Sequence, residues 1–93
     1  MRGRRPRRSR AEIVYEILHT LATRGPQPPT RLSYAARLPY DRFAEILDWL
    51  VEKGYVAVRE EDGRRMVAIT RRGWDAMRDL EAALEILKKL GLA

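Results

Sequence analysis

The pair Asp62-Gly63 limits the fold more than any other feature of the sequence, because it is a strong signal for a two-residue β-hairpin turn. Both central positions of that turn need a positive φ, which Asp and Gly tolerate. A turn at this place pairs Glu61 with Arg64, Glu60 with Arg65, Val58 with Val67, and Val56 with Ile69. Four β-branched residues then share one face, so the turn and the residue pattern agree on the register. The sequence predicts strands over residues 55–59 and 65–70.

The chain before the hairpin has the apolar spacing of helices. Ser9 and Glu12 form a capping box, in which each side chain can satisfy the other residue's exposed backbone amide. A first helix is therefore expected to begin there and to end at Gly25-Pro26. Thr30 is the candidate N-cap of a short second helix that ends at about residue 37.

Two further helices flank the hairpin. The third is expected from about residue 40 to residue 53, because the Leu38-Pro39 pair precedes it and Gly54 closes it. Its buried face is expected to hold Phe43, Ile46, Leu47, Leu50 and Val51. Thr70 is expected to cap a fourth helix of roughly 20 residues, ending near Leu90-Gly91.

The composition is that of one globular domain. The chain has 93 residues, of which 45% are apolar and 34% are charged, and this length leaves no room for a second domain. It has no cysteine, which excludes disulfides, thiol nucleophiles and cysteine metal sites. No apolar run is long enough for a transmembrane helix or a signal peptide, so we expect a cytoplasmic protein without membrane contact. The absence of asparagine and the single glutamine favour a thermophilic source, and GC-rich coding is the alternative explanation for the excess of arginine over lysine.

The formal net charge of +6 is concentrated at the N-terminus. Residues 1–10 contain six arginines and no acid, whereas the basic and acidic residues of 11–93 balance. Residues 1–8 are interpreted as a tail that is disordered alone and binds a polyanion, because arginines neutralise phosphates. Its candidate DNA contacts are Arg4, Arg5, Arg7 and Arg8. A solubilising tail or a misassigned start is the alternative.

Helix, short helix, helix, hairpin and long helix is the element order of a winged helix-turn-helix domain, a mostly helical α+β fold. Residues 30–43, TRLSYAARLPYDRF, together with Lys53-Gly54-Tyr55 resemble the small archaeal winged-helix proteins typified by the ten-kilodalton Sulfolobus DNA-binding proteins. The stretch Ile69-Thr70-Arg71-Arg72-Gly73 is similar to the junction at which their wing meets a C-terminal helix. The resemblance implies an archaeal chromatin-associated or regulatory protein that binds double-stranded DNA and dimerises through its last helix.

Several side chains outside the tail are candidates for DNA contact. Arg31 and Arg71 each follow a threonine at a helix start, where exposed amides already favour anions. Exposed basic residues are more ordinarily weak surface ion pairs, which is the alternative for each. The complete set is Thr30, Arg31, Tyr40, Arg42, Arg64, Arg65 and Arg71.

The exposed face of the third helix is expected to be acidic. Its centre holds Asp41, Glu45, Asp48 and Glu52. A helix in this position normally inserts its N-terminal residues into the major groove, where phosphates repel a carboxylate unless it accepts a hydrogen bond from cytosine. The face could instead bind a protein or the arginine tail. Two functions therefore stay open: a DNA-binding regulator or chromatin protein, and a winged-helix protein–protein interaction module.

The fourth helix has the spacing of a dimer interface. Met77, Leu80, Leu84 and Leu87 follow one another at intervals of three, four and three, which is a heptad seam. We divide the chain into the tail (1–8), the winged helix-turn-helix domain (9–70) and a dimerisation helix (71–93). The alternative is that this helix packs on its own domain.

Nothing in the sequence indicates catalysis. His19 is the only histidine, and neither a glycine-rich phosphate loop nor a nucleophile elbow occurs. Asp41 and Glu45 supply too few ligands for a metal ion. We expect a protein that is not an enzyme and has no cofactor, metal site or small-molecule substrate.

Overall fold

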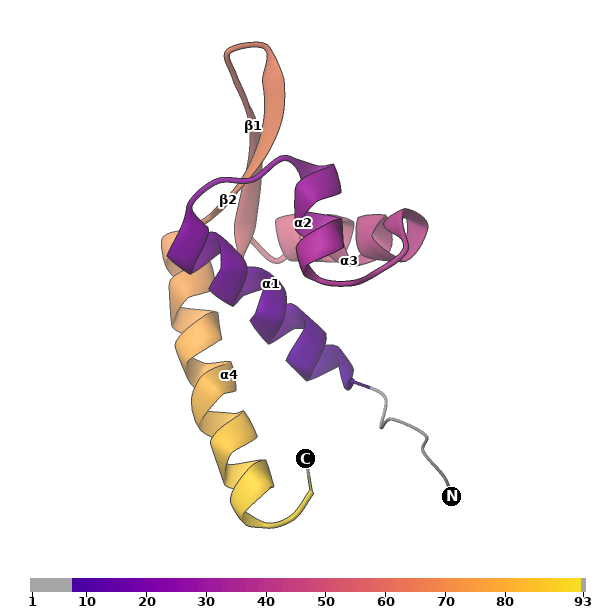
Figure 1. Ribbon diagram of the computed structural model, residues 1–93. Helices are drawn as coiled ribbons and strands as arrows, with labels where there is room; N and C mark the ends of the chain where they lie inside the picture. The colour runs from indigo at the N-terminus through magenta and orange to yellow at the C-terminus, as the bar shows by residue number, and fades with distance from the viewer. Residues whose placement is uncertain (1–7, 93) are drawn as a thin grey trace.

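The computed structural model describes residues 8–92 as four helices and one hairpin (Figure 1). The helices are α1 (Arg10–Arg24), α2 (Pro29–Ala35), α3 (Tyr40–Glu52) and α4 (Arg71–Lys89), and the strands are β1 (Val56–Glu61) and β2 (Arg64–Ile69). The element order and the mostly helical α+β fold are those that the sequence predicts. The predicted tail of residues 1–8 lies outside the described residues except for Arg8.

The start of α1 follows the predicted capping box. The backbone amide of Glu12 donates to Ser9 Oγ at 3.1 Å, and the backbone amide of Ser9 donates to the Glu12 carboxylate at 2.6 Å. The bond from the Ser9 backbone, together with the one from the Ser9 side chain, lowers the pKa of Glu12 from its ordinary value. The helix ends where predicted, since Gly25 caps it with a φ of 81°.

The start of α2 differs from the prediction. Thr30 is not the N-cap, because Pro28 holds that position and the helix begins at Pro29. The pyrrolidine ring of Pro29 presets the φ that a first helical residue needs, and its missing amide costs nothing there. Thr30 lies inside the first turn, and its carbonyl accepts a bond from the Ser33 hydroxyl at 2.8 Å.

The hairpin has the predicted register. Val56 pairs with Ile69, Val58 with Val67, Glu60 with Arg65, and Glu61 with Arg64. Asp62 and Gly63 both have positive φ, at 53° and 75°, as the predicted turn requires. Val67 also exchanges two backbone hydrogen bonds with Gln27, of 2.8 and 3.0 Å. We call the hairpin β1–β2 the wing. These two bonds attach the loop after α1 to the base of the wing.

The core lies where α1, α2, α3 and the base of the wing meet. Its fully buried side chains come from all of these elements: Ile17, Leu18, Leu21, Leu32, Phe43, Leu50 and Val67. Val51 was predicted on the buried face of α3, but its side chain is 42% exposed. The core of so small a domain covers only part of the helix circumference, and Val51 lies at the edge of that part.

The first half of α4 packs on the domain and the second half diverges from α1 (Figure 1). Thr70 caps this helix as predicted: its hydroxyl accepts from the Gly73 amide at 3.0 Å and donates to the Gly54 carbonyl at 2.6 Å. Met77 is buried among core residues, whereas Ile86 and Leu90 are exposed. The same helix is therefore both a core element and an uncovered apolar surface.

Candidate nucleic-acid interface

The helix-turn-helix consists of α2, the four residues 36–39, and α3. No side chain caps α3, because Pro39 holds the N-cap position. Tyr40, the first helical residue, is 45% exposed, and its ring lies 6.1 Å from that of Phe43. Arg42 is exposed in the same turn. The first turn of α3 thus presents one aromatic side chain, one cationic side chain and the carboxylate of Asp41 to the outside.

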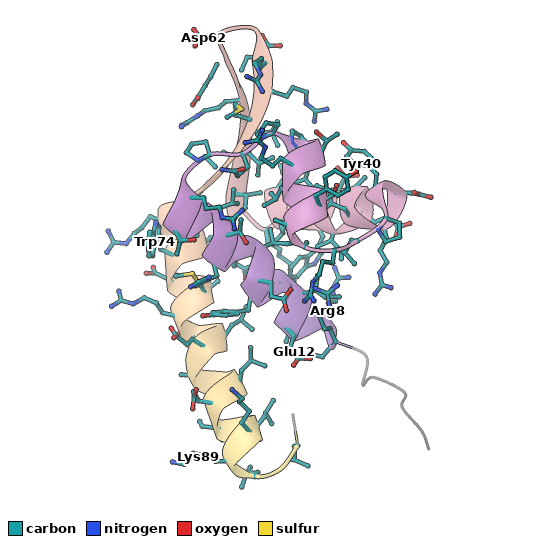
Figure 2. All side chains as sticks on the ribbon, viewed as in Figure 1. Arg8, Glu12, Tyr40, Asp62, Trp74 and Lys89 are labelled. Carbon is teal, nitrogen blue, oxygen red and sulfur yellow. The ribbon has the colours of Figure 1, made fainter. Side chains whose placement is uncertain are left out.

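The wing carries arginines close to its tip, which is marked by Asp62 in Figure 2. Arg59 forms an ion pair with Glu61 of the same strand, with 2.9 Å between Arg59 Nε and the Glu61 carboxylate. Arg64 and Arg65 are exposed, and in the described part of the chain neither forms an ion pair. These two side chains can reach a phosphate without first leaving a carboxylate.

Two predicted arginines lie in the first turns of helices. Arg31 and its neighbour Thr30 are exposed in α2, a helix in which the first turn holds no acid. Arg71 is exposed at the start of α4, where its Nε lies 3.7 Å from the Asp75 carboxylate. Side chains this exposed gain little from such pairs, so both arginines stay available to an external anion.

A cluster of three charged residues connects the N-terminal segment to the helix-turn-helix, and Figure 2 labels one of them, Arg8. Arg8 Nη1 lies 2.6 Å from Glu16 Oε1, and Arg37 Nη2 lies 3.5 Å from the same oxygen. Arg8 Nη2 also donates to the backbone carbonyl of Arg37 at 3.2 Å. Arg4, Arg5 and Arg7 lie outside the described residues. We call Arg8, Glu16 and Arg37 the arm-root cluster.

Arg37 is the residue in this region that sequence reasoning missed. It has a φ of 57°, a left-handed conformation that non-glycine residues rarely adopt, in the turn between α2 and α3. Neither this conformation nor the approach of Glu16 from α1 has a signature in the residue pattern.

The sequence profile of winged helix-turn-helix domains matches residues 7–88. The chain belongs to the winged helix-turn-helix family. Its structure is similar to that of Sso10a-2, a DNA-binding protein from Sulfolobus solfataricus, with a TM-score of 0.80 and 28% sequence identity. The similarity covers 89% of this chain and 85% of that one. The resemblance to small archaeal winged-helix proteins is thereby confirmed.

Two further proteins are similar to this winged helix-turn-helix chain, but each is matched over a smaller part of its own length. An uncharacterised protein of Methanocaldococcus jannaschii is 38% identical over 60 residues, which are 64% of this chain and 61% of that protein. The matched part is thus less than two thirds of the relative's length. A MarR family transcriptional regulator from Streptomyces coelicolor shares the fold, with a TM-score of 0.73 and 24% identity over 86% of this chain and 59% of that one.

The acidic face of α3 is exposed, as the sequence predicts. Asp41, Glu45, Asp48 and Glu52 all lie at the surface of α3. Within residues 8–92, none of the four forms an ion pair. Phosphates beside this helix would meet uncompensated carboxylates along most of its length, and Arg42 is the basic side chain of its outer face.

The predicted dimer residues of α4 have different surroundings. Met77 belongs to the domain core and is not available to a partner, because its own domain buries it. Leu80 and Leu84 are half-buried, and Leu87 is 36% exposed. The apolar residues of α4 that continue this seam and are exposed lie toward the end of the helix: Ile86, Leu87 and Leu90. Trp74, near the start of the same helix, is also 42% exposed.

An apolar groove adjoins this surface. Its volume is about 530 Å³, and it lies between α1, α4 and the junction of α3 with β1. Trp49 and Tyr55, whose rings meet edge to face at 5.8 Å, form one wall, and Arg10 stacks on Trp49 at 4.8 Å. Leu80 and Ala83 form the α4 wall. The groove continues the uncovered face of α4 into the winged-helix domain.

Among the described residues, no three metal-ligating side chains come together. None of the helices in the same range is long and apolar enough to cross a membrane.

Proposed function

We propose that this protein binds double-stranded DNA as a transcriptional regulator or a weakly specific chromatin-associated protein. The observation that carries the proposal is the presence, on a winged helix-turn-helix scaffold, of cationic side chains that pair with no carboxylate of residues 8–92, at the two elements that touch DNA in such folds. These are Arg42 in the first turn of α3 and the pair Arg64 and Arg65 on the wing. The DNA-binding relative Sso10a-2 supports the proposal.

The contacts divide into two kinds. Arg31, Arg64, Arg65 and Arg71, with Arg4, Arg5, Arg7 and Arg8 of the N-terminal segment, bind phosphates and fix the position of the protein on the duplex. Tyr40 and Arg42 enter the major groove, and Thr30 contacts the backbone beside them. Most of the affinity then comes from phosphates, so binding has little sequence preference and weakens strongly with salt.

The experiment that tests the proposal compares arginine variants in duplex binding. The double variant Arg64→Gln/Arg65→Gln should lower the slope of log affinity against log salt by about 1.8, since each lost phosphate contact removes about 0.9. Arg42→Ala should weaken binding as well. Arg78→Gln, at an exposed site on α4, is the control for loss of one charge. If these wing and α3 variants behave like the control, DNA does not bind at the wing and α3.

A second function is favoured by the acidic face of α3. Four exposed carboxylates on one helix suit a basic protein partner better than a phosphate backbone. In that case the winged helix is a protein–protein interaction module, and the N-terminal arginines act in solubility or docking. Absence of duplex binding by the full chain at low salt, together with capture of a basic peptide that Glu45→Gln/Asp48→Asn abolishes, would establish this function instead.

We also propose a homodimer. Ile86, Leu87 and Leu90 form an apolar strip on α4 that its own domain does not cover, and Leu80 and Leu84 lie beside it. A two-fold pairing of α4, in the manner of a short coiled coil, would cover the strip and place two winged helices for paired half-sites.

We further propose a cytoplasmic location, because that is where a DNA-binding protein of this kind meets its DNA. The archaeal source of Sso10a-2 and of the Methanocaldococcus relative supports an archaeal origin, and a thermophilic source stays a prediction.

A further inference from the structure

The N-terminal arginines are attached to the domain at a defined place. Arg8 is the last of the five arginines in residues 1–8, and its guanidinium is bound at the turn between α2 and α3. We propose that Glu16 is a positioning residue for DNA binding: it holds Arg8 at this turn, so that the arginines before it meet the same DNA segment as the first turn of α3. This inference rests on the proposed function.

The geometry of the arm-root cluster is that of an anchor rather than of a chance surface pair. One oxygen of Glu16 lies within 4.0 Å of two guanidinium groups, at 2.6 Å from Arg8 and 3.5 Å from Arg37. The remaining Nη of Arg8 donates to the Arg37 carbonyl at 3.2 Å. The side chains of Arg8 and Glu16 are 24% and 34% exposed. Charge-assisted hydrogen bonds in such partly dry surroundings are stronger than exposed ion pairs.

Each member of the cluster comes from a different part of the chain. Glu16 lies in α1, Arg37 lies in the turn, and Arg8 precedes the N-cap of α1. The bond from Arg8 ends on a carbonyl only three residues before Tyr40, the first residue of α3. The cluster thus fixes where the N-terminal segment leaves the domain: beside the N-terminus of the helix that we propose enters the groove.

The reach of the segment shows what this attachment achieves. Seven residues precede Arg8, and a fully extended chain of that length spans at most about 25 Å. Phosphates follow one another every ~3.4 Å along a DNA strand. Arg2, Arg4, Arg5 and Arg7 therefore act within about seven phosphates of the turn. Anchoring raises their effective concentration at the DNA that α3 contacts.

Glu16 also offsets the electrostatic repulsion between Arg8 and Arg37. Arg8 and Arg37 place two positive charges near one point, and without the carboxylate between them they would separate. Arg37 keeps a 64% exposed side chain while it is paired. Arg8 and Glu16 are both partly buried, so the paired cluster leaves the positive charge of Arg37 at the surface. An acidic residue can in this way favour the binding of DNA.

The experiment is a double-mutant cycle in the full chain, with affinity for a short duplex measured at several salt concentrations. Glu16→Gln should weaken binding by about threefold to tenfold, the size of one coupled cluster of this kind, and lower the salt slope. In the Arg8→Gln background, Glu16→Gln should no longer weaken binding. Glu85→Gln removes the same charge at an exposed site of α4 and should tighten binding slightly, because the net charge rises.

Three results would overturn the proposal. Glu16→Gln could tighten binding as Glu85→Gln does, which would make Glu16 an ordinary opposing charge. It could weaken binding equally with and without Arg8, so that its effect would not pass through Arg8. If Glu16→Gln fails to fold, as a circular dichroism melt would reveal, Arg8→Gln decides alone. It should lower the salt slope by more than the ~0.9 of one phosphate, and a smaller loss contradicts anchoring. Wild-type protein that binds no DNA refutes the proposed function instead.

Discussion

Gly73 shows how closely the wing base and α4 approach each other. A Cβ at this residue would overlap the backbone carbonyl oxygen of Tyr55 and would lie 2.8 Å from Ile69 Cγ1. The neighbour is backbone and cannot move aside cheaply, so the glycine is required for close packing rather than for an unusual φ. This contact fixes the angle at which α4 leaves the domain.

Gly73→Ala should lower the free energy of unfolding by about 1–3 kcal/mol, because overlap with fixed backbone outweighs the better helix propensity of alanine. Urea unfolding followed by circular dichroism measures the change. Arg78→Ala, on the exposed side of the same helix, should be close to neutral. Equal stability of Gly73→Ala and wild type would contradict the close approach.

Glu12 makes the stability that the capping box contributes depend on pH. Its pKa is lowered by the hydrogen bond from the Ser9 backbone, so the folded state favours the ionised form. The resulting stability is present above the ordinary pKa of 4.5 and is lost as the pH falls through the lowered value. Glu12→Gln should therefore flatten the loss of stability between neutral and acidic pH. Thermal midpoints at a series of pH values measure it, and an unchanged profile would remove the capping box from the acid response.

At the scale of elements, local chemistry determined what could be predicted. The hairpin register followed from Asp62-Gly63, and the start of α1 followed from Ser9 and Glu12, because each signal acts within a few residues. The start of α2 was predicted two residues late, since Pro28 rather than Thr30 holds the N-cap position and Pro29 is well suited to the first helical position. Arg37 could not be found, because its partners come from α1 and the N-terminal segment and no local pattern records that approach.

The acidic face of α3 should reduce affinity for DNA. Glu45→Gln/Asp48→Asn removes two exposed carboxylates from the helix proposed to enter the groove, and should tighten duplex binding by an amount equivalent to about 1–2 kcal/mol. Fluorescence anisotropy at low salt measures the change. Glu81→Gln/Glu85→Gln, on α4, controls for net charge. If both double variants change affinity equally, α3 does not lie at the DNA.

For the whole molecule, the uncovered strip on α4 is the surface on which the proposed homodimer rests. The domain covers Met77 but leaves Ile86, Leu87 and Leu90 to solvent, and the apolar groove at Trp49 and Tyr55 continues the strip. The heptad seam of α4 was predicted from residue spacing alone. Spacing identifies the apolar positions of a helix, but it does not tell which of them the domain itself covers. The proposed dimer contact therefore lies toward the end of α4, where Ile86, Leu87 and Leu90 are exposed.

Ile86→Lys/Leu90→Lys should convert a dimer to a monomer, because it places charge in the centre of the strip. Light scattering at micromolar concentration should give twice the chain mass for wild type and a single chain mass for the variant. Glu81→Lys, on the opposite side of the helix, should leave the dimer intact. Wild-type protein that is monomeric at high concentration would contradict the proposed assembly.

The measurement that tests the central claim most directly is a duplex titration over a range of salt, with the full chain and with a chain that begins at Ser9. Both chains should bind, and the shorter chain should have a clearly shallower slope, because it lacks five arginines and each phosphate contact that is lost removes about 0.9 from the slope. Equal slopes would remove the N-terminal arginines from the interface. No binding by either chain at low salt would contradict the account of a DNA-binding protein.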